Sequence, residues 1–338
     1  MNIDLRPDQK ELAAAAREFL SAECPPSRVR SAWDADCVVD RSAWARLAEV
    51  GFLGVVVPER FGGLGRSDVE LALLLEEAGR AALPDPLLET AVAALTIADL
   101  GSDTQVQRWL PAIAAGELVA TIQPPGTPFA VVDGSFDLIV LAINDSLHAV
   151  PVSNCDIEPC KVFDGSRRLA TILAEGTSDT LLPASTGRAD WLAVRASVAA
   201  AATLVGIGAH LVETTVDYVR QREQFGRPVG SFQAVKHQLS NAYVAVEFAR
   251  PATWVAAHLV ASGSDEATTA AAVAKSCASE AEKTANDSAL QCHGGIGFTW
   301  EHDLHLWLKR GKALEQAYGT AREHRARIAH ALFGSSAA

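Results

Sequence analysis

The sequence has 338 residues, enough for two or three domains or for one elaborated fold. Hydrophobic residues make up 49% of the chain and charged residues 21%, a composition that excludes an intrinsically disordered protein. The formal net charge of −12 argues against nucleic acid and against an anionic membrane surface as partners, so any anionic ligand must be met by local basic side chains.

The first 118 residues predict a helical domain. Apolar residues recur there at helical spacing, and Gly and Pro interrupt the pattern. Ser67 with Glu70 three residues later forms a capping box, which marks the start of one helix. A polar loop containing Cys-Pro-Pro is expected after residue 20. The expected helices span residues 8–20, 41–50, 67–80, 87–100 and 104–115.

The composition changes over residues 119–185, which predict a small β domain. Short β-branched runs at 130–132, 138–143 and 168–173 are separated by turn residues. Residues 186–338 return to helical spacing and predict a bundle, in which Pro251 should break the second long helix. The expected helices there span 190–220, 232–262, 265–291, 304–317 and 321–332. The fold class is therefore mainly α with a small β domain.

Cysteine usage and the N-terminus both point to a cytoplasmic protein. The six cysteines form no Cys-x-x-Cys pair, so free thiols are expected, and the N-terminus has no apolar signal region. No membrane span is expected, because the most apolar window, 194–212, carries Arg195 and His210. His302, Asp303 and His305 are spaced too loosely to predict a metal site.

A basic and aromatic stretch at 220–237 lies between two predicted helices. Arg220, Arg222 and Arg227 can bind phosphate or carboxylate in a bidentate manner, and Phe225 and Phe232 add flat apolar surface. By composition alone, a solvated corner between two helices is the stronger interpretation, and a phosphate site is the alternative.

Two glycine motifs also have two interpretations each. Gly206 and Gly208 lie inside a helical pattern, which favours close helix packing over a dinucleotide fingerprint. The run Gly294-Gly295-Ile-Gly297 follows a predicted helix. It favours a helix C-cap, with close approach of the backbone to a ligand as the alternative.

Five stretches, in order along the chain, together resemble the acyl-CoA dehydrogenase family. They are residues 47–65, 73–80 and 101–118, then Arg222-Glu-Gln-Phe-Gly226 with Gln233, and Gln291-Cys-His-Gly-Gly-Ile-Gly-Phe298. The resemblance implies an N-terminal helical domain (1–118), a β domain (119–185) and a C-terminal four-helix bundle (186–338). It also implies α,β-dehydrogenation of an acyl-CoA thioester, in which a glutamate removes the α proton and FAD accepts the β hydride.

Two of these motifs, at 222–226 and 291–298, lie in the C-terminal bundle. In this family, the Arg and Phe of the first motif and the Gln and Gly of the second reach across a subunit interface. They contact the pyrophosphate and adenine part of a neighbouring subunit's FAD. The resemblance therefore implies that Arg222, Phe225, Gln291 and Gly295 bind FAD. Weaker candidates that would line the same site are Gln224, Phe232 and Val235.

The sequence departs from the family at both halves of the catalytic centre. The flavin-binding loop of the family carries an acid and Gly-Ser-Asp, whereas residues 121–128 here read Thr-Ile-Gln-Pro-Pro-Gly-Thr-Pro. The two family positions for the catalytic glutamate fall on Tyr318 and Ala196. Neither residue is a carboxylate base at neutral pH, so no catalytic residue is assigned in this chain.

These departures favour the non-catalytic subunit of a heteromeric enzyme that resembles the actinobacterial steroid-degrading α2β2 type. The Trp300-Glu-His-Asp-Leu-His-Leu306 segment is similar to that branch. A homologous catalytic subunit would share the FAD and bind the acyl-CoA substrate, with electron-transfer flavoprotein as acceptor. The alternatives are a self-sufficient homomeric dehydrogenase with a displaced base such as Glu315, and a flavin-free structural protein.

Overall fold

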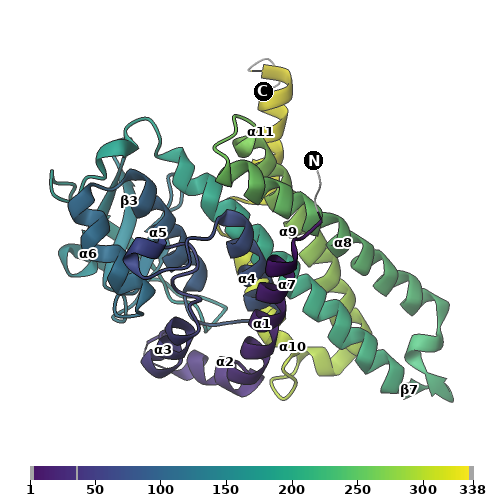
Figure 1. Cartoon of the computed structure of the whole chain (residues 1–338). Helices are drawn as coiled ribbons and strands as arrows, with labels where there is room; N and C mark the ends of the chain where they lie inside the picture. The colour runs from purple at the N-terminus through teal and green to yellow at the C-terminus, as the bar shows by residue number, and fades with distance from the viewer. Residues whose placement is uncertain (1–3, 36, 335–338) are drawn as a thin grey trace.

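The computed structural model describes residues 4–35 and 37–334, which form a mainly helical molecule with a small β region (Figure 1). In Figure 1 the β region and the helices α5 and α6 lie at one side of the molecule. The long helices α7, α8 and α9 run away from that side to a hairpin at the far tip. The predicted fold class, mainly α with a small β region, is confirmed.

The N-terminal part is built from six helices. They are α1 (Pro7–Glu23), α2 (Pro26–Asp34), α3 (Arg41–Glu49), α4 (Asp68–Arg80), α5 (Leu87–Leu100) and α6 (Asp103–Ala114), with a 3-10 turn η1 (Glu59–Phe61). The capping box at the start of α4 is confirmed, since the Glu70 carboxylate accepts from both the backbone N–H and the hydroxyl of Ser67.

The polar loop expected after residue 20 was wrong, because α1 continues to Glu23 and α2 occupies Pro26–Asp34. Pro26 is the first residue of this helix, where a proline lacks no needed hydrogen bond and its fixed φ suits the helix. The Cys-Pro-Pro sequence therefore starts a helix rather than preventing one. Val29 anchors α2 because it is buried in the core.

The β region contains two three-stranded sheets. Their orders are β1-β3-β4 and β2-β6-β5, with β1 parallel to β3 and the other pairs antiparallel. The strands are β1 (Ala120–Gln123), β2 (Ala130–Val131), β3 (Leu138–Ile143), β4 (Ser146–Pro151), β5 (Cys155–Pro159) and β6 (Leu169–Ala174), with 3-10 turns η2 (Val152–Asn154) and η3 (Pro183–Ser185).

The C-terminal part is a bundle of long helices. They are α7 (Asp190–Gln221), α8 (Gln233–Ala261), α9 (Ala267–His293), α10 (Leu304–Gln316) and α11 (Ala321–Phe333). The expected break at Pro251 was wrong, because α8 runs through it. Proline removes one helical hydrogen bond, but α8 packs along α9 on both sides of Pro251, with Ala249 and Thr253 buried, and tertiary packing outweighs the local cost.

Helix α7 is the central helix of the molecule and packs against α4, α8 and α9. A Cβ added at Gly206 would collide with the backbone carbonyl oxygen of Glu76 in α4, and one at Gly79 would collide with the carbonyl of Thr203. The prediction that Gly206 serves close helix packing is thus confirmed. Helix α7 is long and apolar enough to cross a membrane, but 94% of its apolar window is buried inside this fold, as in a core helix.

Two short segments complete the far end of the bundle. A hairpin of β7 (Glu223–Gln224) and β8 (Arg227–Pro228), followed by η4 (Val229–Ser231), joins α7 to α8. The expected glycine loop after α9 is a 3-10 turn, η5 (Gly294–Phe298). In Figure 1 the hairpin projects at the tip farthest from β3.

Candidate functional site

Two regions hold the residues that the sequence singled out, and the first is the exposed far end of the bundle. The last turn of α7 and the end of α9 meet there, because the Tyr218 ring stacks on His293 with centroids 4.2 Å apart. Tyr218 lies four residues before Arg222, and His293 lies two residues after Gln291. The stack therefore brings the two bundle motifs to the same end of the molecule.

Arg222 and Phe225 are held out from the fold in the hairpin. The backbone of Arg222 caps α7 by donating to the Tyr218 carbonyl over 2.9 Å, while its side chain lies in solvent. Among the described residues, no carboxylate lies within ion-pair distance of the Arg222 guanidinium. Phe225 is 91% exposed and has a φ of 54°, a conformation that is unusual for a bulky residue.

The glycine turn presents bare backbone beside Gln291. Gly294 caps α9 with a φ of 61°, so the C-cap interpretation holds at this position. Gly295 and Gln291 are both exposed, and a Cβ added at Gly295 would meet nothing within 4 Å. The space over Gly295 is open to a ligand or to another chain.

The weaker candidates occupy three different settings. Gln224 is exposed and donates to the Glu223 carbonyl over 2.8 Å. Phe232 is half-buried, with the Arg227 guanidinium 4.1 Å above its ring and Phe225 edge-on to it at 6.2 Å. Val235 lines a groove of about 440 Å³ between α7 and α8. Phe232 thus packs directly against the aromatic ring of the hairpin.

The exposed end fits the pyrophosphate and adenine part of FAD. An unpaired guanidinium suits a diphosphate, an exposed aromatic ring suits a flat heterocycle, and glycine backbone allows close approach. These groups face solvent rather than an enclosed pocket of this chain, so a ligand held by them alone would stay half-uncovered. Further surface from another chain would be needed to enclose it.

The second region is buried and contains Tyr318, the residue at which the resemblance places the family's catalytic base. Tyr318 is 8% exposed, and its hydroxyl donates to Glu89 Oε1 over 2.8 Å. The same oxygen of Glu89 accepts from Arg167 Nη2 over 2.8 Å. Burial raises the pKa of Tyr318 well above its usual range, with the Glu89 carboxylate acting in the same direction. Tyr318 is therefore a neutral hydrogen-bond donor at physiological pH.

The backbone at Tyr318 is held in place from several sides. Its φ is 58°, and its carbonyl oxygen lies 3.2 Å from Ser197 Oγ and 3.0 Å from His324 Nε2. Lys275 Nζ donates to the neighbouring Gly319 carbonyl over 2.9 Å. Ala196, the other family base position, is fully buried and directly precedes Ser197. The structure thus brings the two expected base positions close together.

Burial changes the ionisation of the groups that hold this backbone. It lowers the pKa of Lys275 to about 7 and the pKa of His324 to about 4. Glu315 is the candidate displaced base. Its backbone carbonyl accepts a hydrogen bond from Lys275 Nζ, and its carboxylate accepts one from Lys312 Nζ over 3.2 Å. Its carboxylate belongs to this polar cluster and does not line the cavity next to Tyr318.

A cavity of about 350 Å³ lies beside Tyr318, between the β region and the end of α10. Its lining is mostly apolar and includes Phe129, Phe163 and Ala317, with Arg167 at its polar side. Sequence reasoning missed both Glu89 and Arg167. Glu89 lies in the first turn of α5, where an acidic residue is expected because it interacts favourably with the helix dipole. Nothing in the local sequence shows that Glu89 is buried against Arg167 and Tyr318, which lie 78 and 229 positions later in the chain.

The segment at 121–128, where the family has its flavin loop, bonds to itself and to β2. Thr121 is buried in β1 and donates to the Val131 carbonyl over 2.6 Å. Gln123 donates its side-chain amide to the Thr127 carbonyl over 3.1 Å. This segment offers a closed turn where the family has a loop that contacts the flavin.

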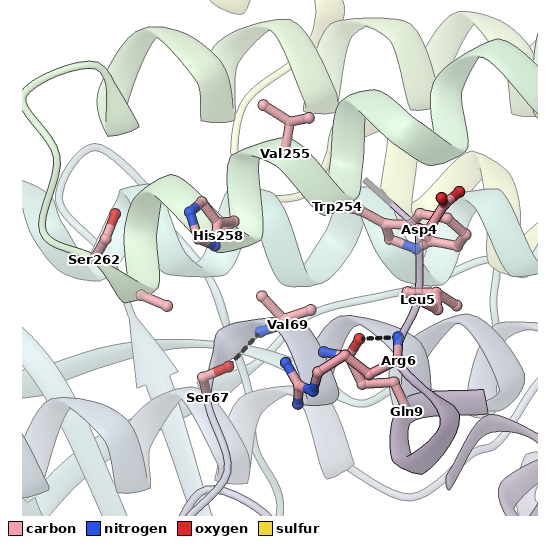
Figure 2. Close-up of a pocket in the computed structure, with 11 residues that line it drawn as sticks. Asp4, Leu5, Arg6, Gln9, Ser67, Val69, Trp254, Val255, His258 and Ser262 are labelled. Atoms are coloured by element: carbon pink, nitrogen blue, oxygen red, sulfur yellow. Dashed lines mark hydrogen bonds between the residues drawn. The ribbon is translucent and has the colours of Figure 1, made fainter. Parts of the chain in front are cut away.

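Another cavity, of about 410 Å³, lies between the N-terminal segment and α8 (Figure 2). Trp254 and Leu5 face it, and it shares no residue with either region above. Ser67 Oγ accepts from the Val69 N–H, and the Arg6 guanidinium pairs with Glu70 over 2.9 Å. These polar groups cap α1 and α4, so the cleft belongs to the helix starts.

The described ranges show no cluster of metal-ligating side chains, and their cysteines are unpaired. No group of three His, Cys, Asp or Glu side chains in residues 4–35 and 37–334 could hold a metal ion. The six cysteines, all of them within those ranges, are free thiols, and burial raises the pKa of Cys24 to about 11.

Comparison with known proteins matches both helical parts of the chain to one family. Residues 6–117 match the model described as "Acyl-CoA dehydrogenase, N-terminal domain", and residues 193–333 match "Acyl-CoA dehydrogenase, C-terminal domain". The chain is 34% identical over 328 residues to "Acyl-CoA dehydrogenase IpdE2" of Mycolicibacterium smegmatis, covering 96% of this chain and 99% of that protein.

Two solved structures share the whole architecture. The structure of the Tcur3481-Tcur3483 steroid ACAD G363A variant superposes with a TM-score of 0.89 and 27% identity, covering 98% of this chain and 99% of that one. The ChsE4-ChsE5 complex from Mycobacterium tuberculosis superposes with a TM-score of 0.88 and 24% identity, also covering 98% and 99%. Because the ChsE4-ChsE5 complex is only 24% identical in sequence, its similarity shows a shared fold and no more.

Proposed function

The chain belongs to the acyl-CoA dehydrogenase family, as its sequence motifs predicted. From that premise we propose that it is the non-catalytic subunit of a heteromeric FAD-dependent acyl-CoA dehydrogenase. It completes the FAD site of a homologous catalytic subunit and supplies no base of its own. The observation that carries the proposal is Tyr318: at the family's base position, a buried phenol donates to Glu89 instead of a free carboxylate facing a ligand.

The exposed end of the bundle supports the other half of the proposal. In the family's reaction, FAD accepts the hydride that leaves the substrate. Arg222 would pair with the diphosphate of this cofactor, Gly295 would let the backbone approach it, and Phe225 and Gln291 would contact its adenine side. All four side chains or backbones are exposed and converge at one end of the molecule.

The partner would provide what this chain lacks, namely a carboxylate base and the flavin-ring loop. Thr121 and Gln123 support this division, because their side chains already bond to the Val131 and Thr127 carbonyls of this chain. The substrate class we propose is a steroid side-chain acyl-CoA thioester, in line with the steroid enzyme that shares this architecture. The two kinds of subunit would form a cytoplasmic α2β2 assembly. Electron-transfer flavoprotein would accept the electrons from its FAD.

The competing function is a self-sufficient homomeric dehydrogenase with Glu315 as base. The contacts of Glu315 count against it, because its carboxylate accepts from Lys312 and is absent from the lining of the Tyr318 cavity. A flavin-free structural protein is the other competitor, and it is tested by the same experiment.

Flavin content of purified protein separates these functions. The chain is purified alone and also after co-expression with a full-length homologous dehydrogenase subunit, and FAD absorbance and acyl-CoA turnover are measured in both preparations. We expect FAD and turnover in the co-purified complex only. Stoichiometric FAD with turnover from the chain alone would contradict the proposal of a heteromeric enzyme. Absence of FAD from both preparations would favour a flavin-free structural protein.

A further inference from the structure

We propose that the cavity beside Tyr318 is a separate ligand site, which binds a compact apolar carboxylate without flavin and without turnover. The inference rests on the proposed function, because it takes the base position of this chain to be catalytically silent. It goes beyond that function, since a subunit that only completes its partner's FAD site needs no ligand pocket of its own.

The size and lining of the cavity indicate the apolar part of the ligand. Its volume of about 350 Å³ lies within the range of small-molecule sites. Val131 and Leu169 line it from the β region and Ala313 from α10. Phe129 and Phe163 also line it, and these residues are 41% and 55% exposed overall. A compact apolar body would cover aromatic surface that otherwise faces water.

The charges around the cavity indicate the carboxylate. Two carboxylates near its wall are already neutralised: Asp164 accepts from Arg310 over 2.6 Å, and Glu89 accepts from Arg167. Lys161 also lines the cavity and has no hydrogen-bond or ion-pair partner among the described residues. The unbalanced charge at this site is therefore positive, and an anionic group on the ligand would meet it.

The wall at Tyr318 is rigid before any ligand binds. The left-handed backbone of this residue persists because Ser197, His324 and the Glu89 carboxylate fix its carbonyl and its hydroxyl. Strain that the surroundings over-determine in this way is typical of a preorganised binding site. The same bonds prevent chemistry, because the phenol already donates its proton to a buried carboxylate and cannot accept another.

The test uses naphthalene-2-carboxylate as the probe and its neutral isostere, naphthalene-2-carboxamide, as the comparison. Calorimetry measures both affinities for the co-purified complex and for the chain alone. We expect the carboxylate to bind at least tenfold more tightly than the carboxamide. Lys161→Ala should abolish this difference, and the control Lys283→Ala, which removes an exposed lysine from α9, should preserve it.

A second variant tests the location independently of charge. Ala317→Trp places a large ring in the cavity, so it should weaken both probes at least tenfold while FAD in the complex stays at the wild-type level. Circular dichroism melting shows whether Ala317→Trp folds. If it does not fold, Lys161→Ala, at the exposed edge of the cavity, decides whether the carboxylate binds there. Equal affinity for the two wild-type probes, or an unchanged affinity of folded Ala317→Trp, would overturn the inference.

The proposed function fails in a different way from this inference. Turnover and stoichiometric FAD in the chain alone would remove the catalytically silent role, whatever the probes do. Failure of the carboxylate site would leave FAD in the complex, and its dependence on Arg222, untouched.

Discussion

The two regions of this molecule treat polar groups in opposite ways. At the exposed end, Arg222 has no carboxylate partner among the described residues and Phe225 is 91% exposed. In the buried centre, the Glu89 carboxylate accepts hydrogen bonds from Arg167 and Tyr318, so each of these donors has its acceptor within the same chain. The buried cluster satisfies its own hydrogen bonds, whereas the exposed end leaves donors and apolar surface that another molecule could cover.

The largest expected effect comes from breaking the buried cluster. Glu89→Ala leaves the Arg167 cation and the Tyr318 hydroxyl buried without their shared acceptor. Removal of one partner from a buried ion pair costs about 3–5 kcal/mol. We expect a loss of this size in the free energy of unfolding, measured by urea denaturation.

An exposed ion pair of the bundle is the matched control. Glu280→Ala removes the partner of Arg325, whose pair spans 2.8 Å with both side chains at least half exposed. Such pairs contribute roughly 0–1 kcal/mol. A similar loss in the two variants would mean that the Glu89 cluster is no better protected from water than the surface pair.

Two glycines sharpen the comparison through the same substitution. Gly206→Ala forces a methyl group onto the Glu76 carbonyl between α7 and α4, and overpacking of this kind costs about 1–3 kcal/mol. Gly295→Ala meets open space, so the free energy of unfolding should stay within about 0.5 kcal/mol of wild type. Of these two glycine variants, Gly295→Ala should lower FAD retention in the complex without a loss of stability. If Gly295→Ala retains FAD normally, no cofactor approaches that backbone.

How much the sequence could foresee follows the same division. The exposed residues lie within short motifs that resemble those of the family, so the resemblance predicts one site for Arg222 and Gln291, and the structure places both motifs at the same end of the molecule. Local signals also sufficed for the capping box at Ser67 and for the packing role of Gly206. Pro26 misled, because proline both ends helices and starts them, and the choice depends on what the next turn can bury.

The buried centre could not be foreseen for a physical reason. Glu89, Arg167 and Tyr318 come from three parts of the chain, and each has an ordinary local environment in the sequence. Only the packing of α5, the β region and the end of α10 excludes water from all three. The resemblance placed Tyr318 at the expected base position, but the sequence could not show what its hydroxyl bonds to.

Arg222 gives the next effect in size, on the exposed side of the comparison. A charge-assisted hydrogen bond contributes about 1.5–3 kcal/mol, so Arg222→Ala should weaken FAD retention in the complex at least tenfold, with stability unchanged. Arg220→Ala is the control, because Arg220 lies nearby and faces Asp217 at 3.5 Å. Equal losses in both variants would indicate a diffuse charge effect rather than a specific contact by Arg222.

The smallest effect is a pH dependence that belongs to the buried centre alone. Burial lowers the pKa of His324 to about 4, while in the unfolded chain it titrates near 6.5. Between these values the unfolded state binds a proton that the folded state refuses, so the stability contribution is complete above pH 6.5 and is lost as the pH falls toward 4. The slope approaches 1.4 kcal/mol per pH unit, which gives about 1 kcal/mol between pH 7.5 and 5.5.

His324→Gln removes this titration and keeps an amide near the Tyr318 carbonyl, which His324 Nε2 approaches to 3.0 Å in the wild type. Urea unfolding at pH 7.5 and 5.5 should therefore show a smaller pH-dependent loss for His324→Gln than for the wild type, and the exposed His258→Gln should match the wild type. His210 and His305, whose pKa values burial also lowers to about 4, keep the remaining slope. If His324→Gln and His258→Gln lose stability equally, His324 is charged in the folded protein, and the buried centre is not closed to protons as its contacts imply.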